Sequence, residues 1–286
     1  MGASKVAVKV LERVPKSAVS RAFGVVSDLE LPRPVQGVVN QAFARLAGID
    51  MDEAQGPPKE YRSLNAYFTR RLKEGARSLQ PESPGALISP VDGRVGAFGA
   101  VESGTLLQAK GREYSLLDLV DSAEKADRFQ GGHYITLYLS PRDYHRIHAP
   151  AAGRVDRISY IPGHLFPVNP FAVENVDELF AVNERLITYL ATETFGDVAV
   201  IKVGATCVGR ITLSFQGFQT NQRFARRQEI DVLEEIPMAA GQELAAFNLG
   251  STVILLIEEE GFRFADSVVG GAMMRVGEVL GEVGRV

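Results

Sequence analysis

The sequence predicts an α+β protein, with N-terminal amphipathic helices followed by a β-rich domain built from two similar β-units. Three observations support this fold class. Apolar residues recur at helical spacing through about the first 50 residues. From about residue 86 onward, short runs rich in Val, Ile, Tyr and Phe are separated by Gly, Pro and Asp, as in β-structure. One seven-residue pattern also occurs twice, sixty positions apart.

Helices are predicted in three N-terminal segments. The first ends at Pro15, the second at the break Pro32-Arg33-Pro34, and the third at Gly48, a residue typical of a helix C-terminal cap. Pro34 suits the first turn of the third helix, because its missing N–H would have no partner there. The apolar positions of the three segments are Val6, Val10 and Val14, then Val19, Ala22, Phe23 and Val26, then Val35, Val38, Val39, Ala42, Phe43 and Leu46.

The first 25 residues are basic, with five lysine or arginine residues against one glutamate. Two interpretations of the helical region stay open. It is either a small subdomain packed on the rest of the chain or a basic amphipathic surface that lies on anionic lipid. A basic N-terminus also fits a cleaved organellar transit peptide. The charged residues are Lys5, Lys9, Arg13, Lys16, Arg21 and Glu12.

Composition places the 286-residue chain among globular proteins, with 45% hydrophobic and 23% charged residues. The net charge of −4 argues against nucleic-acid binding, for which a basic excess is typical. No apolar run reaches the ~18–20 residues that cross a bilayer. Lys9, Glu12 and Arg13 interrupt any secretory signal, so the protein is expected in the cytoplasm. The single cysteine, Cys207, cannot form an internal disulfide and is expected in the core.

A linker at Gly56–Pro58 divides the chain into a helical region, residues 1–58, and a β-rich region, residues 59–286. Ser63 is expected to cap a short helix that runs through Leu72. One further helix is expected at residues 177–193. Strands are expected at residues 134–139, 154–161, 198–203, 210–215 and 252–257.

The repeated pattern joins a turn to a strand. Ser89-Pro-Val-Asp-Gly-Arg-Val95 is matched by Ala149-Pro-Ala-Ala-Gly-Arg-Val155. Similar turns occur in lipoyl- and biotinyl-carrier domains, but those carriers need a lysine at a hairpin tip and neither copy has one. The repeat is therefore interpreted as architecture, two β-units that face one another.

His145 and His148 stand close together beside a proline turn, which suggests acid–base chemistry or metal binding. On a strand their side chains would face opposite sides, whereas in a helical turn they would share one. Metal is the weaker choice, because the chain offers no cysteine cluster, no His-Glu-x-x-His helix and no obvious third ligand. Either histidine could instead be a structural hydrogen-bonding residue.

Asp92 and Ser251 complete the candidate set. Asp92 lies in a tight turn beside Gly93, a place where aspartate is also common for structural reasons. Ser251 directly follows Gly250 at the start of an apolar strand, where the pair could be an ordinary turn. Together, Asp92, His148 and Ser251 supply an orienting acid, a base and a nucleophile.

These residues lie in motifs that resemble the prokaryotic-type phosphatidylserine decarboxylases, in family order from about Ser63 to Ile257. The N-terminus is similar in character only, and the chain beyond Ile257 matches weakly. His164 stands where an acidic or small residue is expected, so its role stays open. The motifs are Ser89 to Val95, Leu139-Ser-Pro-Arg-Asp-Tyr-His-Arg-Ile-His-Ala-Pro150, Tyr160-Ile-Pro-Gly-His-Leu-Phe-Pro-Val-Asn169, Asn183-Glu-Arg185, Val203-Gly-Ala-Thr206 and Leu249-Gly-Ser-Thr252.

The resemblance implies a zymogen that cuts itself between Gly250 and Ser251 into a β chain, residues 1–250, and an α chain, residues 251–286. Ser251 Oγ would attack the Gly250 carbonyl carbon, with His148 as the base and Asp92 holding the imidazole. Glycine tolerates the strained backbone that this acyl shift needs. Elimination and hydrolysis would leave a pyruvoyl group on the new N-terminus. Neither a metal nor pyridoxal phosphate is then expected as a cofactor.

The resemblance also implies decarboxylation of phosphatidylserine to phosphatidylethanolamine, a step of phospholipid biosynthesis. The pyruvoyl group would take the substrate amine as a Schiff base and accept electrons as carbon dioxide leaves. His145 would donate the proton, and Leu165 and Phe166 would contact the lipid. The implied setting is peripheral, on the anionic, cytoplasmic side of the cell membrane. The α and β chains would form a heterodimer, with further dimerisation as the family suggests.

Two other functions stay open from the residues alone. A serine hydrolase or self-processing peptidase could use the same Asp92, His148 and Ser251, although a Gly-x-Ser-x-Gly elbow is absent. A lipoyl-like β-module could serve as a membrane-bound scaffold without catalysis. Only the decarboxylase requires both a cut before Ser251 and a blocked N-terminus, so the intact mass separates the three.

Overall fold

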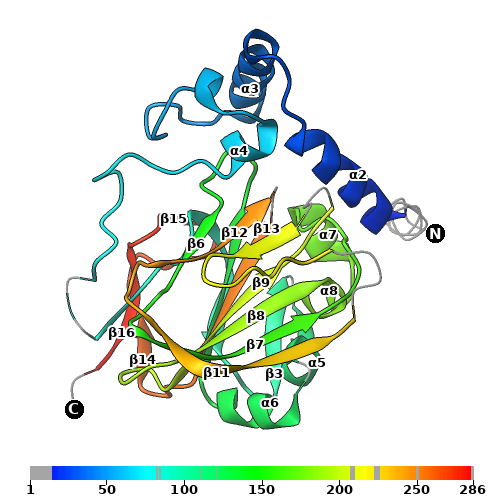
Figure 1. Cartoon of the computed structure of the whole chain (residues 1–286). Helices are drawn as coiled ribbons and strands as arrows, with labels where there is room; N and C mark the ends of the chain where they lie inside the picture. The colour runs from blue at the N-terminus through cyan, green and yellow to red at the C-terminus, as the bar shows by residue number, and fades with distance from the viewer. Residues whose placement is uncertain are drawn as a thin grey trace.

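The computed structural model describes residues 15–284 apart from positions 82, 84, 110, 121, 207–209, 222–225 and 249–250. The helix predicted before Pro15 and the core position predicted for Cys207 lie outside the described residues. Within them, helices and antiparallel sheets occur together, which confirms the α+β class. The N-terminal helices gather at one end of a β-rich body (Figure 1).

Two of the predicted N-terminal helices are confirmed as α2 (Lys16–Asp28) and α3 (Arg33–Ala47). Gly48 ends α3 at φ 72°, in the left-handed region that glycine adopts without strain. None of the helices in the described ranges is long and apolar enough to cross a membrane.

The helix capped by Ser63 is α4 (Leu64–Phe68), and the 3-10 helix η1 (Pro58–Glu60) precedes it. The Ser63 hydroxyl accepts a hydrogen bond from the Ala66 N–H at 3.0 Å. α4 ends earlier than the predicted Leu72, because the residues after it bond to the segment that holds the two histidines. The Thr69 carbonyl accepts from Arg146 Nε at 2.9 Å, and Arg70 donates to the Arg142 carbonyl at 3.0 Å.

The main sheet has eight antiparallel strands, and the strand that begins at Ser251 lies in its interior. Every residue of this strand is buried, since neighbouring strands and both covered faces surround it. The strand order is β11 (Gln228–Met238), β7 (Gly153–Ile161), β8 (Arg185–Ala191), β9 (Asp197–Val203), β13 (Ser251–Ile257), β5 (His133–Leu139), β2 (Gly93–Ala100) and β15 (Met273–Met274). The strands predicted from residues 134, 154, 198 and 252 are thereby confirmed.

Smaller sheets and short helices complete the body. The predicted strand at residue 210 is confirmed as β10 (Arg210–Leu213), which pairs with β12 (Glu243–Asn248), itself paired with β6 (Arg146–His148). A second small sheet joins β1 (Ala86–Ile88), β16 (Val279–Val283) and β14 (Phe262–Phe264), and β3 (Thr105–Ala109) pairs with β4 (Arg112–Ser115). The remaining helices are α5 (Leu116–Val120), α6 (Ala123–Phe129), α7 (Pro170–Asn175) and α8 (Leu179–Val182).

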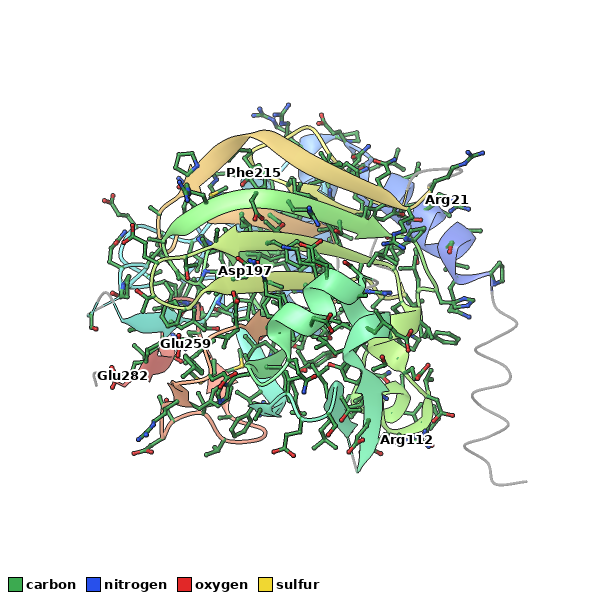
Figure 2. All side chains as sticks on the ribbon, turned by 90° about the horizontal axis from the view of Figure 1, so that it is seen from below. Arg21, Arg112, Asp197, Phe215, Glu259 and Glu282 are labelled. Carbon is green, nitrogen blue, oxygen red and sulfur yellow. The ribbon has the colours of Figure 1, made fainter. Side chains whose placement is uncertain are left out.

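Asp197 ties α6 to the main sheet. This carboxylate, labelled in Figure 2, is buried and receives Lys125 Nζ at 3.3 Å and Arg128 Nη1 at 2.8 Å, both from α6. Figure 2 also places Arg21 of α2 and Glu282 of β16 at opposite sides of the molecule.

The helix predicted at residues 177–193 is wrong. Only Leu179–Val182 is helical, and the rest of the range forms strand β8 from Arg185 onward. β8 lies between β7 and β9 and is buried at six of its seven residues. A strand covered on both faces shows no period-2 alternation, so its apolar run has the same pattern as a buried helix.

Both copies of the repeated pattern lead into strands as predicted, β2 from Gly93 and β7 from Gly153. Both strands belong to the main sheet, on either side of β13. The glycine of the second copy is required by packing. A Cβ at Gly153 would lie 2.6 Å from the Ala191 carbonyl oxygen of the neighbouring strand.

Candidate active site

Ser251 is the first residue of β13 and pairs with Leu139, the last residue of β5. Its side chain is 1% exposed, and its Oγ has no hydrogen-bond partner among the described residues. Buried hydroxyl groups are nearly always hydrogen-bonded, so an unpaired one requires an explanation, which a catalytic role can supply. The adjacent Thr252 Oγ1 is buried and, in the described part of the chain, unpaired as well. Gly250, the other half of the predicted cleavage site, lies outside the described residues.

Asp92 is buried, and both of its carboxylate oxygens accept hydrogen bonds. Its Oδ2 receives Arg77 Nη2 at 2.6 Å, and its Oδ1 receives Arg77 Nε at 3.2 Å and the Val276 N–H at 2.8 Å. Arg77 also bonds Glu53 through Nη1 at 3.0 Å and Nη2 at 2.8 Å. This bond to Arg77 lowers the pKa of the Glu53 carboxyl. Asp92 is therefore held from two directions, by the segment before the β-rich body and by the C-terminal segment.

His148, the last residue of β6, is also buried and has both ring nitrogens occupied. Nδ1 lies 2.7 Å from the Gly241 carbonyl oxygen, which can only accept, so Nδ1 carries the proton. Nε2 then has the lone pair and accepts from the Tyr144 hydroxyl at 3.0 Å. Burial lowers the pKa of His148, which favours the neutral form that a base requires.

The structure brings Asp92 and His148 close through the backbone, because the His148 N–H donates to the Pro90 carbonyl at 2.8 Å. Their side chains make no hydrogen bond with one another in the described part of the chain, and Ser251 Oγ bonds to neither. The Gly241 carbonyl, rather than Asp92, sets the imidazole tautomer here. The predicted triad stays a prediction, and its assembly requires side-chain movement.

His145 has different surroundings. It is fully buried, its Nδ1 donates to the Asp143 carbonyl at 2.9 Å, and Nε2 has no partner among the described residues. The Phe68 ring of α4 lies 4.0 Å away between centroids. Burial lowers the pKa of His145 to about 3, so the ring is neutral with a free lone pair on Nε2.

Sequence reasoning missed two residues of this site, Tyr144 and Arg70. Tyr144 is the first residue of the Tyr-His-Arg-Ile-His motif, and its position next to His145 could have marked it as a candidate site residue. Arg70 is 4% exposed and donates through Nη2 to the carbonyls of Arg142 and Asp143. A single arginine after a short helix carries no sequence signature, so nothing marked it.

The predicted lipid contacts, Leu165 and Phe166, are both buried. The Asn183 side chain makes two hydrogen bonds with the Phe166 backbone. Its Oδ1 accepts from the Phe166 N–H at 3.0 Å, and its Nδ2 donates to the Phe166 carbonyl at 2.9 Å. Lys16 of α2 lies over the Phe166 ring at 4.1 Å. His164 is exposed, and its backbone pairs with the Asn183 region. The contact of Leu165 and Phe166 with a lipid stays a prediction.

Two cavities adjoin the candidate residues. One of about 370 Å³ is lined by His148, Tyr144, Arg77 and Glu243. The other, of about 390 Å³, is lined mainly by apolar side chains, with Thr252 of β13 and Tyr138 of β5 in its wall. The second cavity thus reaches the residue next to Ser251. No cluster of three or more His, Cys, Asp or Glu side chains suited to a metal occurs in the described ranges.

Comparison with known proteins identifies the family. A family model described as phosphatidylserine decarboxylase matches residues 64–282, beyond Ile257, where only weak similarity was expected. A phosphatidylserine decarboxylase proenzyme of Anaeromyxobacter sp. (strain K) is 45% identical over 96% of this chain and 97% of its own length. Proenzymes of the same name from Myxococcus xanthus and Brevibacillus brevis are 42% and 40% identical, over 96% and 95% of this chain and 98% and 95% of their own lengths. This chain therefore belongs to the phosphatidylserine decarboxylase family.

Proposed function

We propose that this protein decarboxylates phosphatidylserine to phosphatidylethanolamine with a pyruvoyl group formed from its own Ser251. The names of its relatives support the substrate, and their designation as proenzymes supports processing. One observation carries the proposal: the buried, unpaired Oγ of Ser251 at the start of β13. A pyruvoyl group at that position supplies an electron sink for the carbanion left by carbon dioxide.

The cleavage step uses groups of the chain itself. Ser251 Oγ attacks the Gly250 carbonyl carbon, the peptide C–N bond breaks, and the proton from Oγ passes to the released nitrogen by way of His148 Nε2. A base then removes the α proton of residue 251 as the Gly250 carboxylate leaves, which gives a dehydroalanine. Water adds to this dehydroalanine and its nitrogen leaves as ammonia, so that a pyruvoyl group remains. His148 Nε2 suits this role because it is unprotonated, but Tyr144 must first release it. Asp92 would support the imidazolium that forms.

His145 is proposed to move the proton during decarboxylation. The imidazole of His145 is neutral and its Nε2 has no partner among the described residues, so it first accepts a proton. The ammonium group of the substrate is the proposed donor of that proton. His145 could then return this proton to the α-carbon after carbon dioxide leaves, which is the general-acid role. The bond from Nδ1 to the Asp143 carbonyl holds the ring in the orientation that leaves Nε2 free.

The two chains formed by cleavage would stay together. Residues 251–286 contribute β13 to the interior of the main sheet, between β5 and β9, and add β15 beside β2 and β16 beside β1. These ladders do not depend on the Gly250–Ser251 bond. They support the proposed α/β heterodimer, and further dimerisation stays a prediction. No metal and no pyridoxal phosphate enters the proposed reaction.

Helices α2 and α3 are proposed to dock on the membrane, because most of their apolar residues are exposed. Inward, α2 buries Lys16, Ser20 and Ser27, and α3 buries Gln36, Gly37, Asn40 and Ala44. The polar contacts are specific: Gln36 Nε2 donates to Asn40 Oδ1 at 2.8 Å. The exposed apolar residues are Val19, Phe23, Val25, Val26, Val35, Val38, Val39 and Leu46.

Exposed apolar groups along two successive helices are typical of a surface that binds a partner or a membrane. Both helices lie at the end of the body farthest from α6 (Figure 1). We therefore propose that residues 1–58 attach the protein peripherally to the cytoplasmic side of the cell membrane, and that residues 59–286 form the catalytic domain. Arg21, Arg33 and Arg45 are exposed on the same helices and suit anionic lipid.

The activity is tested with purified protein and vesicles that contain phosphatidylserine. The wild type should release carbon dioxide and form phosphatidylethanolamine, and Ser251→Ala should do neither. A wild type that is cleaved but forms no phosphatidylethanolamine would contradict the proposed substrate.

A further inference from the structure

Arg70 is a buried arginine with most of its hydrogen-bonding capacity unused. Nη2 donates to the carbonyls of Arg142 at 3.0 Å and Asp143 at 3.3 Å. Nε and Nη1 are buried and have no partner among the described residues. A guanidinium taken out of water is costly unless an anion or several acceptors compensate it. The centroid of the Tyr67 ring lies 5.8 Å from the guanidinium carbon and adds a cation–π contact. Nε and Nη1 are still left without a hydrogen-bond acceptor in the described ranges.

The neighbouring carboxylates do not provide that anion. Asp92 and Glu53 lie near enough to act on Arg70 electrostatically, but their oxygens are bonded to Arg77. The Asp143 carboxylate accepts from the Ser140 N–H at 2.7 Å and lies 3.7 Å from Arg142 Nε. No carboxylate of the described residues bonds to Arg70, so the site lacks one negative group.

Arg70 lies beside the proposed reaction centre. The Asp143 carbonyl oxygen that it contacts is also the acceptor for His145 Nδ1 at 2.9 Å. The turn from Ser140 to Asp143 directly follows Leu139, the partner of Ser251 in the sheet. One carbonyl oxygen thus joins the arginine to the histidine, at the end of the sheet where the cut would fall.

We propose that Arg70 binds the phosphodiester of the substrate headgroup through Nε and Nη1, an inference that rests on the proposed function. The substrate has two anions, a carboxylate and a phosphodiester. An arginine on the carboxylate would stabilise the charge that decarboxylation removes, and so would slow the reaction. The phosphodiester keeps its charge from substrate to product, and the planar guanidinium matches its oxygens.

The test compares two soluble substrates that share the serine amine and carboxylate. Glycerophospho-L-serine carries the phosphodiester, and O-methyl-L-serine lacks it. The variants are Arg70→Gln and Arg70→Lys, with Arg71→Gln as the matched control, because the neighbouring Arg71 side chain is 65% exposed. The intact mass of each protein is measured first, so that cleavage and pyruvoyl formation are judged separately from binding.

All variants should be cleaved like the wild type. Arg70→Gln should lose about 10- to 100-fold in kcat/KM for glycerophospho-L-serine, mainly through KM, as expected for a lost charged hydrogen bond. Its kcat/KM for O-methyl-L-serine should stay within about twofold, and Arg70→Lys should recover part of the loss. Arg71→Gln should change neither.

Three results would overturn the proposal. A wild type that does not prefer the phosphodiester substrate has no phosphate site. An equal loss on both substrates would make Arg70 a support for His145 through the shared carbonyl. An uncut Arg70→Gln chain would place the residue in maturation. By contrast, a wild type without cleavage or activity would contradict the proposed function itself.

Discussion

The hydroxyl of Tyr144 donates a hydrogen bond to Nε2 of His148 at 3.0 Å, the nitrogen on which the proposed cleavage depends. The Gly241 carbonyl occupies the other ring nitrogen, so the imidazole is fixed on both sides. His148 is therefore neutral and hydrogen-bonded through both ring nitrogens, whereas Ser251 Oγ has no partner among the described residues. For the proposed cleavage, His148 would therefore have to exchange its bond with Tyr144 for one with Ser251.

Tyr144→Phe should free Nε2 without emptying the site. Since a neutral hydrogen bond contributes about 0.5–1.5 kcal/mol, cleavage should proceed about 2- to 10-fold faster than in the wild type. The half-time of cleavage is read from gels after synthesis in a cell-free system. Tyr138→Phe, on β5, is the matched control and should cut at the wild-type rate. Slower or absent cleavage in Tyr144→Phe alone would show that the hydroxyl takes part in the step.

The two histidines should divide maturation from turnover. His148→Ala should accumulate the uncut chain, because Ser251 then lacks a base, and Asp92→Asn should do likewise. His145→Ala should be cut but lose decarboxylation by the ~10²–10⁴-fold typical of a missing general acid. One gel and one activity assay for each variant decide this. If His145→Ala stays uncut while His148→Ala is processed, the roles are reversed.

The free energy of unfolding should decrease as the pH is lowered, because of His145. Its pKa is lowered to about 3 in the folded chain, against about 6.5 unfolded, so the unfolded state binds a proton in that window and the folded state does not. In the uncut Ser251→Ala protein, this removes about 3 kcal/mol of unfolding free energy between pH 7 and pH 4. Adding His145→Gln should remove that part of the pH dependence.

Urea denaturation at pH 7, 5.5 and 4 measures the difference between these two proteins. Carboxyl groups with shifted pKa values, such as Asp143 and Glu184, are present in both and cancel in the comparison. Parallel curves for the two proteins would mean that the fold does not lower the pKa of His145, which would then titrate alike in the folded and unfolded chains.

Membrane binding should depend on the outward apolar residues of α2 and α3. Val26 and Val38 are 61% and 67% exposed, so Val26→Asp with Val38→Asp should leave the fold intact. Each removed apolar contact should weaken vesicle binding by about 1 kcal/mol or more, and each new carboxylate is repelled by anionic lipid. Leu117→Asp, on α5 and 48% exposed, is the control.

Vesicle sedimentation with and without phosphatidylserine measures this binding. Deletion of residues 1–48 should weaken it further and make the protein easier to extract. Undiminished sedimentation of the double variant would mean that these helices are ordinary packing and that the attachment lies elsewhere.

The sequence predicted the local signals well, because these are set by neighbouring residues. Gly48 ends α3 and Ser63 caps α4 for reasons that lie within one helical turn. β8 was missed because its burial comes from β7 and β9, which are distant in the sequence. The outward apolar face of α3 was also hidden, since periodicity reveals an apolar face but not its direction.

At the site, the motif residues could be named but their partners could not. Asp92 meets Arg77 and Val276, and Arg70 meets Asp143, through contacts between segments far apart in the chain. Only the fold brings such pairs together. The same holds for Gly241, whose carbonyl fixes the His148 tautomer without any side chain to mark it.

The central claim is that Ser251 becomes a pyruvoyl group by cutting the chain before it. Denaturing mass spectrometry of the purified wild type tests this directly. The expected masses are those of residues 1–250 and of a 36-residue chain, 251–286, lighter by one ammonia than the same peptide with an N-terminal serine. Ser251→Ala should give one uncut chain. Active wild-type protein recovered only at full length, or a small chain that begins with free serine, would contradict the account.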